Sequence, residues 1–392
     1  MIQNALDCNC TGCSACVNAC PVSAITMEPD AFGFSMPRVN NEKCIKCRKC
    51  LISCPSLNPL QGSPYRDPEV FAAWHKDEQI RVESTSGGVF SALSEAVLAR
   101  DGYVVGAEYD GEFLIRHTII HSEKEIKRQR QSKYAQSDLG SIFSDIKKLL
   151  DNQQLVLFCG TPCQSAGLQK YLSKAYANLY CCDFICRGVI SPKVYRKFLH
   201  DMHPASGAAL NKVHFKNKDF GWNRFSTKLT FSDGSSYQRD RNEDYYMCGY
   251  LRHNLYLRDC CYQCDYKTLP RISDISLGDF WGIGNYDPSL DNEQGTSVVL
   301  VNSEKGQQLL RWACEQLVLT ERTINEVLAG NSCLQTSATR GEFRDYFFKK
   351  IDNTHFAALI ERIDKMSVKL SFTDRILQRL SAVKHWIMGD KT

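Results

Sequence analysis

Apolar residues between about residues 70 and 205 follow two spacings in turn. Short unbroken runs over 70–74, 103–107 and 155–158 are typical of buried strands. Between them, apolar residues three to four positions apart predict helices over 88–100 and 139–150. Strands that alternate with helices favour an α/β domain built on a largely parallel sheet.

The pattern differs on either side of this region. Near the N-terminus, residues 24–37 read as a short hairpin between two similar halves, with no closing strand expected after the second half. After residue 205, segments 228–231 and 237–239 flank the turn 232–235 and predict an antiparallel hairpin. Thr373 is the expected N-cap of a final helix with one apolar stripe. That stripe consists of Ile376, Leu377, Leu380, Val383 and Ile387.

These changes predict an α+β / α/β protein of four parts. A small ferredoxin-like N-terminal domain comes first, a mixed α/β flavin-binding domain follows in two regions, and a C-terminal helical tail ends the chain. The expected bounds are 1–60, 70–150, 151–340 and 341–392.

Composition adds few constraints. The chain has 392 residues, 43% of them hydrophobic and 23% charged, as in ordinary globular proteins. Its net charge of +4, without a basic patch interleaved with aromatics, does not indicate a nucleic-acid partner. No signal peptide or membrane span is apparent, and cysteines spaced for clusters favour a cytoplasmic location.

Eight of the 20 cysteines form two runs with the spacing C-x2-C-x2-C-x3-C-P, as in bacterial ferredoxins with two [4Fe-4S] clusters. In that arrangement the last cysteine of each run binds the other cluster. The first predicted set of ligands is Cys10, Cys13, Cys16 and Cys54, and the second is Cys44, Cys47, Cys50 and Cys20. A structural zinc site or a disulfide framework is the alternative interpretation.

Two glycine-containing turns follow. Thr85 to Gly88 precede a predicted helix, where free amides bind an anion such as a pyrophosphate, although Ser and Thr there also serve as ordinary N-caps. Gly160 and Thr161 end a buried strand, the usual place for ligands of open α/β sheets. Cys163 begins the next helix, where a thiol has a lowered pKa, unless it is simply a buried structural cysteine.

A third group of cysteines suggests another cluster. Cys261 and Cys264 form a C-x2-C pair, and Cys163 and Cys186 lie at turns. Four thiolates are the usual ligands of a [4Fe-4S] cluster. We therefore predict a third cluster on these four cysteines, with Cys260, Cys248 and Cys182 as substitutes.

Several motifs in fixed order resemble the family of coenzyme F-420 hydrogenase/dehydrogenase beta subunits over about residues 70–320. They are Ser86-Gly-Gly, Lys133-Tyr-Ala-Gln-Ser, Gly160-Thr-Pro-Cys-Gln, Ile185-Cys-Arg-Gly-Val-Ile-Ser-Pro, Phe220-Gly-Trp, Cys261-Tyr-Gln-Cys and Ser273-Asp-Ile-Ser-Leu-Gly-Asp-Phe-Trp. The resemblance implies a flavoprotein that binds FAD and at least one [4Fe-4S] cluster and passes electrons between a two-electron partner and iron–sulfur centres.

The resemblance also implies positions around the FAD, although it names no catalytic residue. These are Thr85, Ser86, Gly87, Gly88, Tyr134, Ser137, Gly160, Thr161 and Gln164, with Lys133 and Arg271 for its phosphates or an anionic substrate. One position departs from the family, which usually has a histidine where this chain has Arg187. A guanidinium binds anions but does not exchange protons near neutral pH.

Other polar residues indicate structure rather than chemistry. Asp274 and Asp279 are five apart, which places them on opposite faces of a strand, so we expect them to fix turns. His117 and His121 have no partner motif and are expected at the surface. Gly282-Ile-Gly284 lacks the third glycine of a dinucleotide fingerprint, so NAD binding is not supported.

The resulting hypothesis is an oxidoreductase in which electrons pass between a carrier such as ferredoxin, three clusters, FAD and a small-molecule substrate, in either direction. The deazaflavin coenzyme is one candidate for the two-electron partner. The alternatives are a non-catalytic relay subunit and a reductase of polysaccharide or lipid-linked sugar synthesis. For the basic C-terminal tail, one expectation is that it lies on a membrane or a partner, and the alternative is that it packs on its own protein.

Overall fold

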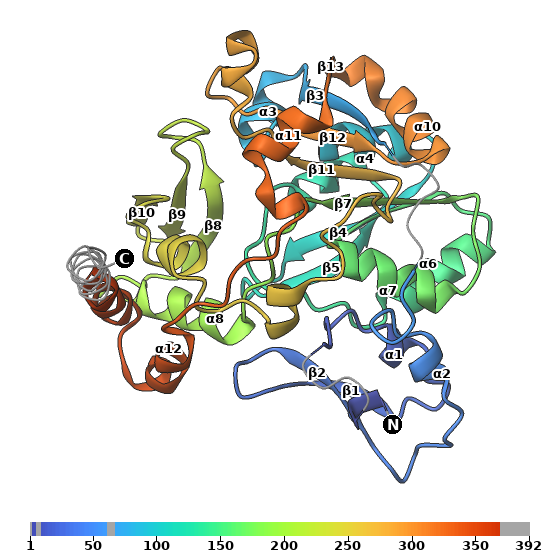
Figure 1. Cartoon of the computed structure of the whole chain (residues 1–392), viewed down its shortest axis with the longest axis horizontal. Helices are drawn as coiled ribbons and strands as arrows, with labels where there is room; N and C mark the ends of the chain where they lie inside the picture. The colour runs from blue at the N-terminus through green and yellow to red at the C-terminus, as the bar shows by residue number, and fades with distance from the viewer. Residues whose placement is uncertain (1, 5–8, 61–66, 369–392) are drawn as a thin grey trace, which may run out of the picture.

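The computed structural model describes residues 2–4, 9–60 and 67–368. Figure 1 shows a small N-terminal unit beneath a larger body that contains two further sheets. The larger body has an eight-stranded mixed sheet and, beside it, a three-stranded antiparallel sheet. The expected fold class is therefore confirmed for the described residues.

The N-terminal unit has two short helices and one hairpin. The helices are α1 (Ala15–Asn18) and α2 (Lys49–Ile52), and the strands are β1 (Ile25–Pro29) and β2 (Ser35–Val39). The strands pair antiparallel, from Ile25 opposite Val39 to Pro29 opposite Ser35. Residues 55–60 contain no strand, as expected from the sequence. Because it has so little secondary structure, this unit depends on its cysteines and its contacts with the larger body.

The large sheet is parallel only at its centre. Its strand order is β13-β3-β12-β11-β7-β6-β4-β5, and only the pairs β11–β7, β7–β6 and β6–β4 are parallel. The sequence predicted a largely parallel sheet, but β5 hairpins back onto β4, and β3, β12 and β13 form an antiparallel flank. The strands are β3 (Glu69–His75), β4 (Tyr103–Tyr109), β5 (Ile115–Ile120), β6 (Val156–Cys159), β7 (Leu179–Phe184), β11 (Ile275–Asp279), β12 (Ser297–Val301) and β13 (Leu317–Arg322).

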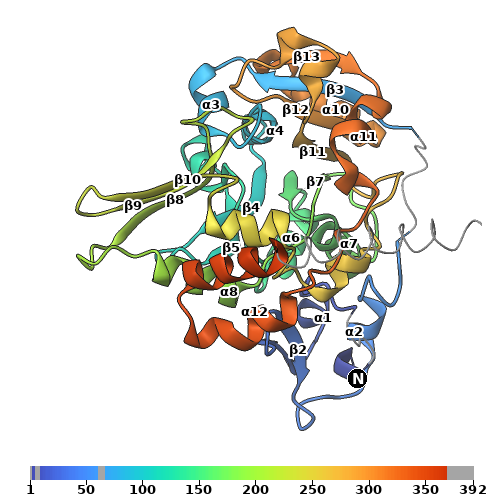
Figure 2. The same cartoon turned by 60° about the vertical axis from the view of Figure 1, so that its left-hand side comes forward.

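Helices cover both faces of this sheet (Figure 2). On one face α4 (Val89–Leu98) and α10 (Glu304–Ala313) bury Leu93, Val97 and Leu309 against the strands. On the other face α6 (Ile142–Asp151) and α7 (Pro162–Leu172) pack through Phe143 and Leu168. Shorter helices at the edges are α3 (Glu78–Glu83), α5 (Ile126–Gln129) and α11 (Ile324–Gly330).

A second core joins the three-stranded sheet to the C-terminal helices. The sheet has the order β10-β9-β8, and its β9–β10 pair is the hairpin expected from the sequence. Phe198, Phe215, Tyr246 and Phe356 pack together in this core. Its elements are α8 (Pro192–Asp201), β8 (Leu210–Asn217), β9 (Ser226–Phe231), β10 (Ser236–Asp240), α9 (Tyr245–Met247), α12 (Arg344–Lys350) and a helix over 356–368.

The predicted apolar stripe that begins after Thr373 lies outside the described residues. Within the described ranges, no helix is both long enough and apolar enough to cross a membrane.

Candidate functional site

A cavity of about 890 Å³ opens where the central parallel strands end. Its wall includes Cys159 to Thr161 at the end of β6 and Asp183 to Ile190 at the end of β7. Because β6 and β7 are parallel neighbours, their carboxyl ends meet at one edge of the sheet. The wall also includes residues 84–86, 88–90 and 129–135, together with Phe225 and Arg241, which flank strands of the three-stranded sheet.

The loop before α4 reaches this cavity through its backbone more than through its hydroxyl groups. Thr85 Oγ1 lies 3.1 Å from Ser132 Oγ, and Ser86 Oγ donates to the carbonyl of Thr296 at 2.9 Å. The N-cap of α4 is Gly88, in a left-handed conformation with φ of +88°. The alternative that a Ser or Thr caps this helix is therefore wrong. The first amides of α4 have no acceptors within the helix, and its first two residues line the cavity.

The adjacent residue Gly87 is restricted by close packing rather than by its backbone conformation. A Cβ there would lie 2.2 Å from the carbonyl oxygen of Ala73, so the loop packs directly on β3. Gly87 itself does not line the cavity, whereas Thr85, Ser86 and Gly88 do.

The turn after β6 is held by a reciprocal cap. Gln164 Oε1 accepts from the Thr161 amide at 2.9 Å, and Thr161 Oγ1 accepts from the Gln164 amide at 3.3 Å. The Gln164 amide group also donates to Ser137 Oγ at 3.0 Å, which joins the turn to the second motif. A Cβ on Gly160 would lie 2.9 Å from the Phe158 ring. These predicted residues therefore meet at one rim of the cavity.

Lys133 and Tyr134 line the cavity, but the lysine ammonium is already engaged. Lys133 Nζ donates to four carbonyls at the end of α5, at 2.7–3.2 Å. They belong to Arg128, Gln129, Arg130 and Gln131. Lys133 therefore fixes the segment that leads to Tyr134, whose ring packs edge-on against Phe215 and Tyr250.

Polar atoms without partners mark the cavity wall. Among the described residues, five buried side-chain atoms in this wall have no hydrogen-bond partner. They are His117 Nδ1, Gln129 Oε1, Asp183 Oδ2, Arg187 Nε and Asn331 Nδ2. Buried polar groups are normally satisfied, so each of these atoms is an exception within the residues of this wall. The cavity size, the free helix amides and these atoms all fit FAD.

His117 was expected at the surface and is instead 7% exposed. Its Nε2 lies 3.1 Å from the Cys159 carbonyl, which accepts, so Nδ1 is left as a hydrogen-bond acceptor. Burial lowers the pKa of His117 to about 4. His117 was expected at the surface because it has no partner motif, but its ring stacks on Phe158 of β6 rather than facing solvent. His121, at 44% side-chain exposure, is at the surface as expected.

The four cysteines predicted to bind a third cluster lie beside this cavity. The Cys163 thiol interacts electrostatically with the thiols of Cys186, Cys261 and Cys264, although they come from three separate segments. Cys163 Sγ is 3.1 Å from Thr161 Oγ1, and Cys186 lines the cavity itself. The structure thus brings the four together.

Burial changes the chemistry expected of these thiols. It raises the pKa of Cys163 well above its usual value and that of Cys186 to about 12. The sequence predicted a lowered pKa for Cys163 at the N-terminus of α7, but desolvation outweighs the helix dipole. A positively charged metal centre favours the thiolate in such an environment. Within the described ranges, no three His, Cys, Asp or Glu side chains converge on a single ion. A cubane does not require this, since each thiolate binds a different iron.

The first ferredoxin quartet faces the larger body. Cys10, Cys13, Cys16 and Cys54 are all buried and line one small cavity. A Cβ added to Gly167 in α7 would lie 2.8 Å from Cys13 Sγ. The Tyr266 hydroxyl is within electrostatic range of both Cys13 and Cys163, so this residue is near the first and the third quartet.

The second quartet is more exposed than the first. The Cys50 thiol interacts with those of Cys47 and Cys20, and burial raises its pKa. Cys47 is exposed, whereas Cys20, Cys44 and Cys50 are half-buried. The two quartets therefore differ in surroundings although their spacing in the sequence is identical.

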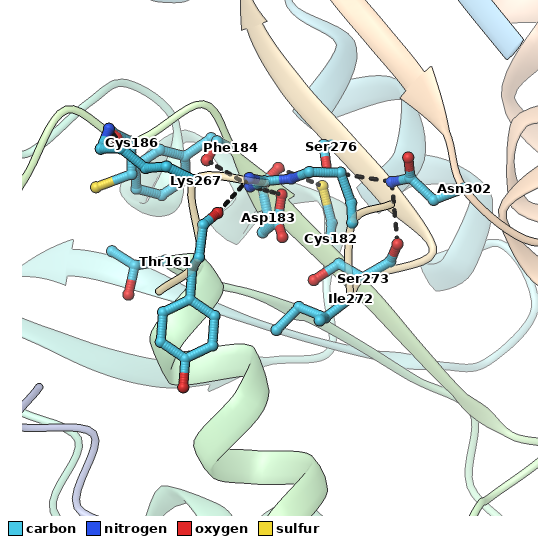
Figure 3. A network of polar contacts seen from close by, with 12 residues as sticks. Thr161, Cys182, Asp183, Phe184, Cys186, Lys267, Ile272, Ser273, Ser276 and Asn302 are labelled. Carbon is cyan, nitrogen blue, oxygen red and sulfur yellow. Dashed lines mark hydrogen bonds and ion pairs between the residues drawn. The ribbon is translucent and has the colours of Figure 1, made fainter. Parts of the chain in front are cut away.

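Arg271 is not among the cavity residues. Figure 3 shows a polar network that includes Asp183, Phe184 and Ser276, and the Arg271 guanidinium donates to all three residues. It pairs with Asp183 Oδ1 at 2.9 Å and donates to the Tyr266 carbonyl at 2.8 Å, and both partners of the ion pair are buried. Nearby, Lys267 Nζ donates to the Cys186 and Cys333 carbonyls. These contacts hold the loops that carry Cys186 and Cys264. Because the donors of Arg271 are used within the protein, its guanidinium is not free to bind a phosphate.

Asp274 and Asp279 have different surroundings. Asp274 accepts from the Cys181 amide at 2.8 Å and from Ser303 Oγ at 2.6 Å, as expected for a residue that fixes turns. Asp279 lines the cavity, where Lys216 Nζ lies 2.7 Å from its carboxylate and Trp222 donates to it at 2.9 Å.

Sequence reasoning missed this end of the cavity. The stacked rings of Trp222 and Trp281, 4.9 Å apart, lie next to Lys216, whose Nζ is 4.3 Å from the Trp281 ring centre. Lys216 belongs to β8 and carries no motif of its own. In the sequence, its position shortly before the Phe220-Gly-Trp motif was the only indication that Lys216 belongs to the site.

Comparison with known proteins agrees with the motifs. The model of the coenzyme F420 hydrogenase/dehydrogenase beta subunit N-terminal region matches residues 70–144, and that of its C-terminal region matches residues 153–327. The model of a 4Fe-4S dicluster domain matches residues 9–58.

Individual relatives are distant. An F(420)H(2) dehydrogenase subunit of Methanosarcina mazei is 19% identical over 324 residues, which cover 80% of this chain and 84% of that protein. A polyferredoxin-like protein of Methanocaldococcus jannaschii is 37% identical over 54 residues, or 12% of this chain and 32% of its own length.

Among solved structures, a chain of the F420-reducing [NiFe] hydrogenase complex from Methanosarcina barkeri has a TM-score of 0.48 and 16% identity. The match covers 78% of this chain and 95% of that one.

The two regions matched by the beta-subunit family models, 70–144 and 153–327, contain the motifs described above in the same order. The chain belongs to the family of coenzyme F420 hydrogenase/dehydrogenase beta subunits, an oxidoreductase family, and carries a 4Fe-4S dicluster domain ahead of the family's two regions.

Proposed function

We propose that this chain is an FAD- and [4Fe-4S]-dependent oxidoreductase that moves electrons between a one-electron carrier protein and a two-electron organic substrate. The observation that carries the proposal is the cavity with its unpartnered polar atoms, directly beside a set of four converging thiols. When bound, FAD supplies the exchange between two-electron and one-electron chemistry that such an enzyme needs.

The residues that would hold the FAD are those that line the cavity near α4 and α7. Gly88 leaves the amides of α4 open to a pyrophosphate, since its backbone has no Cβ to cover them. His117 Nδ1 would accept a hydrogen bond from an N–H or O–H group of the ligand. Gln164 and Ser137 fix the opposite rim through their mutual hydrogen bond.

Arg187 replaces the usual histidine and is oriented by its own contacts. Its Nη2 donates to Asn254 Oδ1 at 2.7 Å and to the Leu251 carbonyl at 3.1 Å, while Nε remains without a partner. A guanidinium held in this way binds a negative group in the cavity. Proton transfer must therefore rely on another group or on water, which distinguishes this chain from relatives that have the histidine.

The three quartets suggest a path with an order. The second quartet is the most exposed, the first faces α7 and Tyr266, and the third touches the cavity wall. Electrons passing along this order would connect the protein surface to the cavity. The deazaflavin coenzyme is one candidate for the two-electron partner, because the relatives' names refer to coenzyme F420.

A relay subunit is the second candidate function. The relative from Methanosarcina mazei is named as a subunit, which favours partner proteins for this chain as well. The two candidates share the clusters but differ in whether the cavity turns over a substrate without other proteins.

Iron, sulfide and flavin should be counted in protein purified without oxygen. Three clusters and one flavin correspond to about 12 iron atoms and one FAD per chain. The flavin should then lose its visible absorbance on addition of reduced deazaflavin or reduced ferredoxin in the absence of any other protein. Protein that contains iron but binds no flavin would refute the oxidoreductase proposal and favour the relay.

A further inference from the structure

The two cysteine quartets of the ferredoxin unit have opposite environments. The first is buried against the larger body, where Arg258 Nε donates to the Cys10 carbonyl at 2.6 Å. The second contains the exposed Cys47, and all residues of 41–50 except Cys44 and Cys50 are exposed. Figure 1 shows the N-terminal unit at the periphery, with α1 next to α7. One end of the unit therefore remains open for a partner.

Three large apolar side chains that are close in sequence to cysteines of the second quartet are exposed. Ile45 is 61% exposed and Ile52 is 67% exposed, and Val22 adds a third exposed side chain. Each lies within two residues of a cysteine of the second quartet. Exposed apolar side chains that gather at one place, with polar residues around them, mark an interaction site.

Four positively charged residues lie in the same exposed segment. Lys43, Lys46, Arg48 and Lys49 are all exposed, against one acidic residue, Glu42, in the same ten-residue segment. Among the described parts of the chain, no ion pair involves any of the four. Their charge is therefore available to attract an acidic surface over a distance of about 10 Å at 0.1 M salt.

We propose that this second-cluster face, made of Val22, Ile45, Ile52 and the four cations, is the docking surface for a small acidic one-electron carrier protein. The inference rests on the proposed electron path and adds its outer end. An apolar centre within a charged rim matches the anatomy of transient interfaces. Complementary charge raises the association rate, and the apolar centre limits dissociation.

Charge reversal tests the face directly. One variant combines Lys43→Glu, Lys46→Glu, Arg48→Glu and Lys49→Glu. The matched control combines Lys124→Glu, Lys127→Glu, Lys349→Glu and Lys350→Glu, four exposed lysines outside the N-terminal unit and without ion pairs among the described residues. Both variants change the net charge by the same amount.

The probes are an acidic bacterial two-cluster ferredoxin and a basic c-type cytochrome. The association rate of the ferredoxin with the parent protein should fall as salt is added. In the face variant at low salt it should be lower by about tenfold or more, with a flat or inverted salt dependence, whereas the control should follow the parent. The cytochrome should show the opposite change. A face variant that binds ferredoxin at the parental rate and salt slope overturns the inference.

Two further measurements keep this result separate from the proposed function. Binding of oxidised ferredoxin needs no turnover, so it remains measurable even if the cavity holds no flavin. If the face variant loses iron, Lys46→Gln with Lys49→Gln should still weaken ferredoxin binding in a salt-dependent manner, and parental binding by this pair would refute the docking surface. A dimer of this chain that the face variant dissolves would assign the surface to a second copy and reject the carrier.

Discussion

Arg258 links the first ferredoxin quartet to the rest of the protein, and removing it should release that quartet. Its side chain is 3% exposed and lies two residues before the cysteine pair 260–261. The guanidinium donates to the carbonyls of Cys10 and Ser35 at 2.6 and 2.9 Å. It also donates to Gln136 Oε1 at 2.9 Å. One buried cation therefore holds the ligand loop, the hairpin and the α/β domain together.

The change Arg258→Met keeps much of the apolar stem and removes all of these donors. Two buried acceptors and the half-buried Ser35 carbonyl would lose their partner, and an unsatisfied buried acceptor costs about 1–3 kcal/mol. Because the surroundings relax and water enters, we expect the lower part of the summed cost of the three acceptors, so docking of the ferredoxin unit should weaken by about 3–5 kcal/mol. Since about 1.36 kcal/mol is a factor of ten, the detached population should increase by about 100-fold or more.

Iron transfer to a ferrous chelator under anaerobic conditions measures that detachment, because the buried first quartet must become accessible before its cluster is lost. About one third of the iron should leave Arg258→Met much faster than it leaves the parent. Arg258→Lys keeps the charge without the planar fork and should be intermediate. Arg340→Met is the control, since Arg340 is 48% exposed and pairs only at the surface with Asp345.

Equal chelation rates for Arg258→Met and the parent, with full iron content in both, would refute this reasoning. They would mean that the first quartet is retained by its thiolates alone and that the contacts of Arg258 add nothing to docking.

Two further predictions concern single side chains. Cys16→Ala should remove about four iron atoms and leave flavin bound. Cys261→Ala should remove about four other iron atoms and alter the flavin absorbance, because its quartet adjoins the cavity. An unchanged iron content in Cys261→Ala would reject the third quartet. The lowered pKa of His117, about 4 against 6.5, means that the unfolded chain binds more protons between these values, so stability should fall as pH drops through that window and be fully present above it. From about pH 7.5 to about pH 5.5 the loss is about 1.3 kcal/mol, and His117→Gln, which keeps a donor for the Cys159 carbonyl, should lose less stability on the same acidification in thermal denaturation. An identical loss in both proteins would show that His117 is not buried in its neutral form.

The sequence by itself determined the local elements and the family. Strand and helix spacings are local properties, so β3, β4, β6, α4 and α6 lie where their apolar patterns predict them. The motifs carried the family assignment because several of them occur in a fixed order over most of the chain. The spacing of the two cysteine runs predicts which thiols share a cluster, and the structure places Cys10, Cys13, Cys16 and Cys54 around one small cavity. The assignment of the clusters themselves stays a prediction.

Only the tertiary structure decided which polar groups remain free. Lys133 and Arg271 read as anion ligands in the sequence, but carbonyls at the end of α5 and the carboxylate of Asp183 occupy their donors. His117 was expected at the surface because no partner motif accompanies it, yet the end of β6 lies against its ring and buries it. Hydrogen-bond partners and burial depend on residues brought together from distant segments, and no pattern along one segment contains that information.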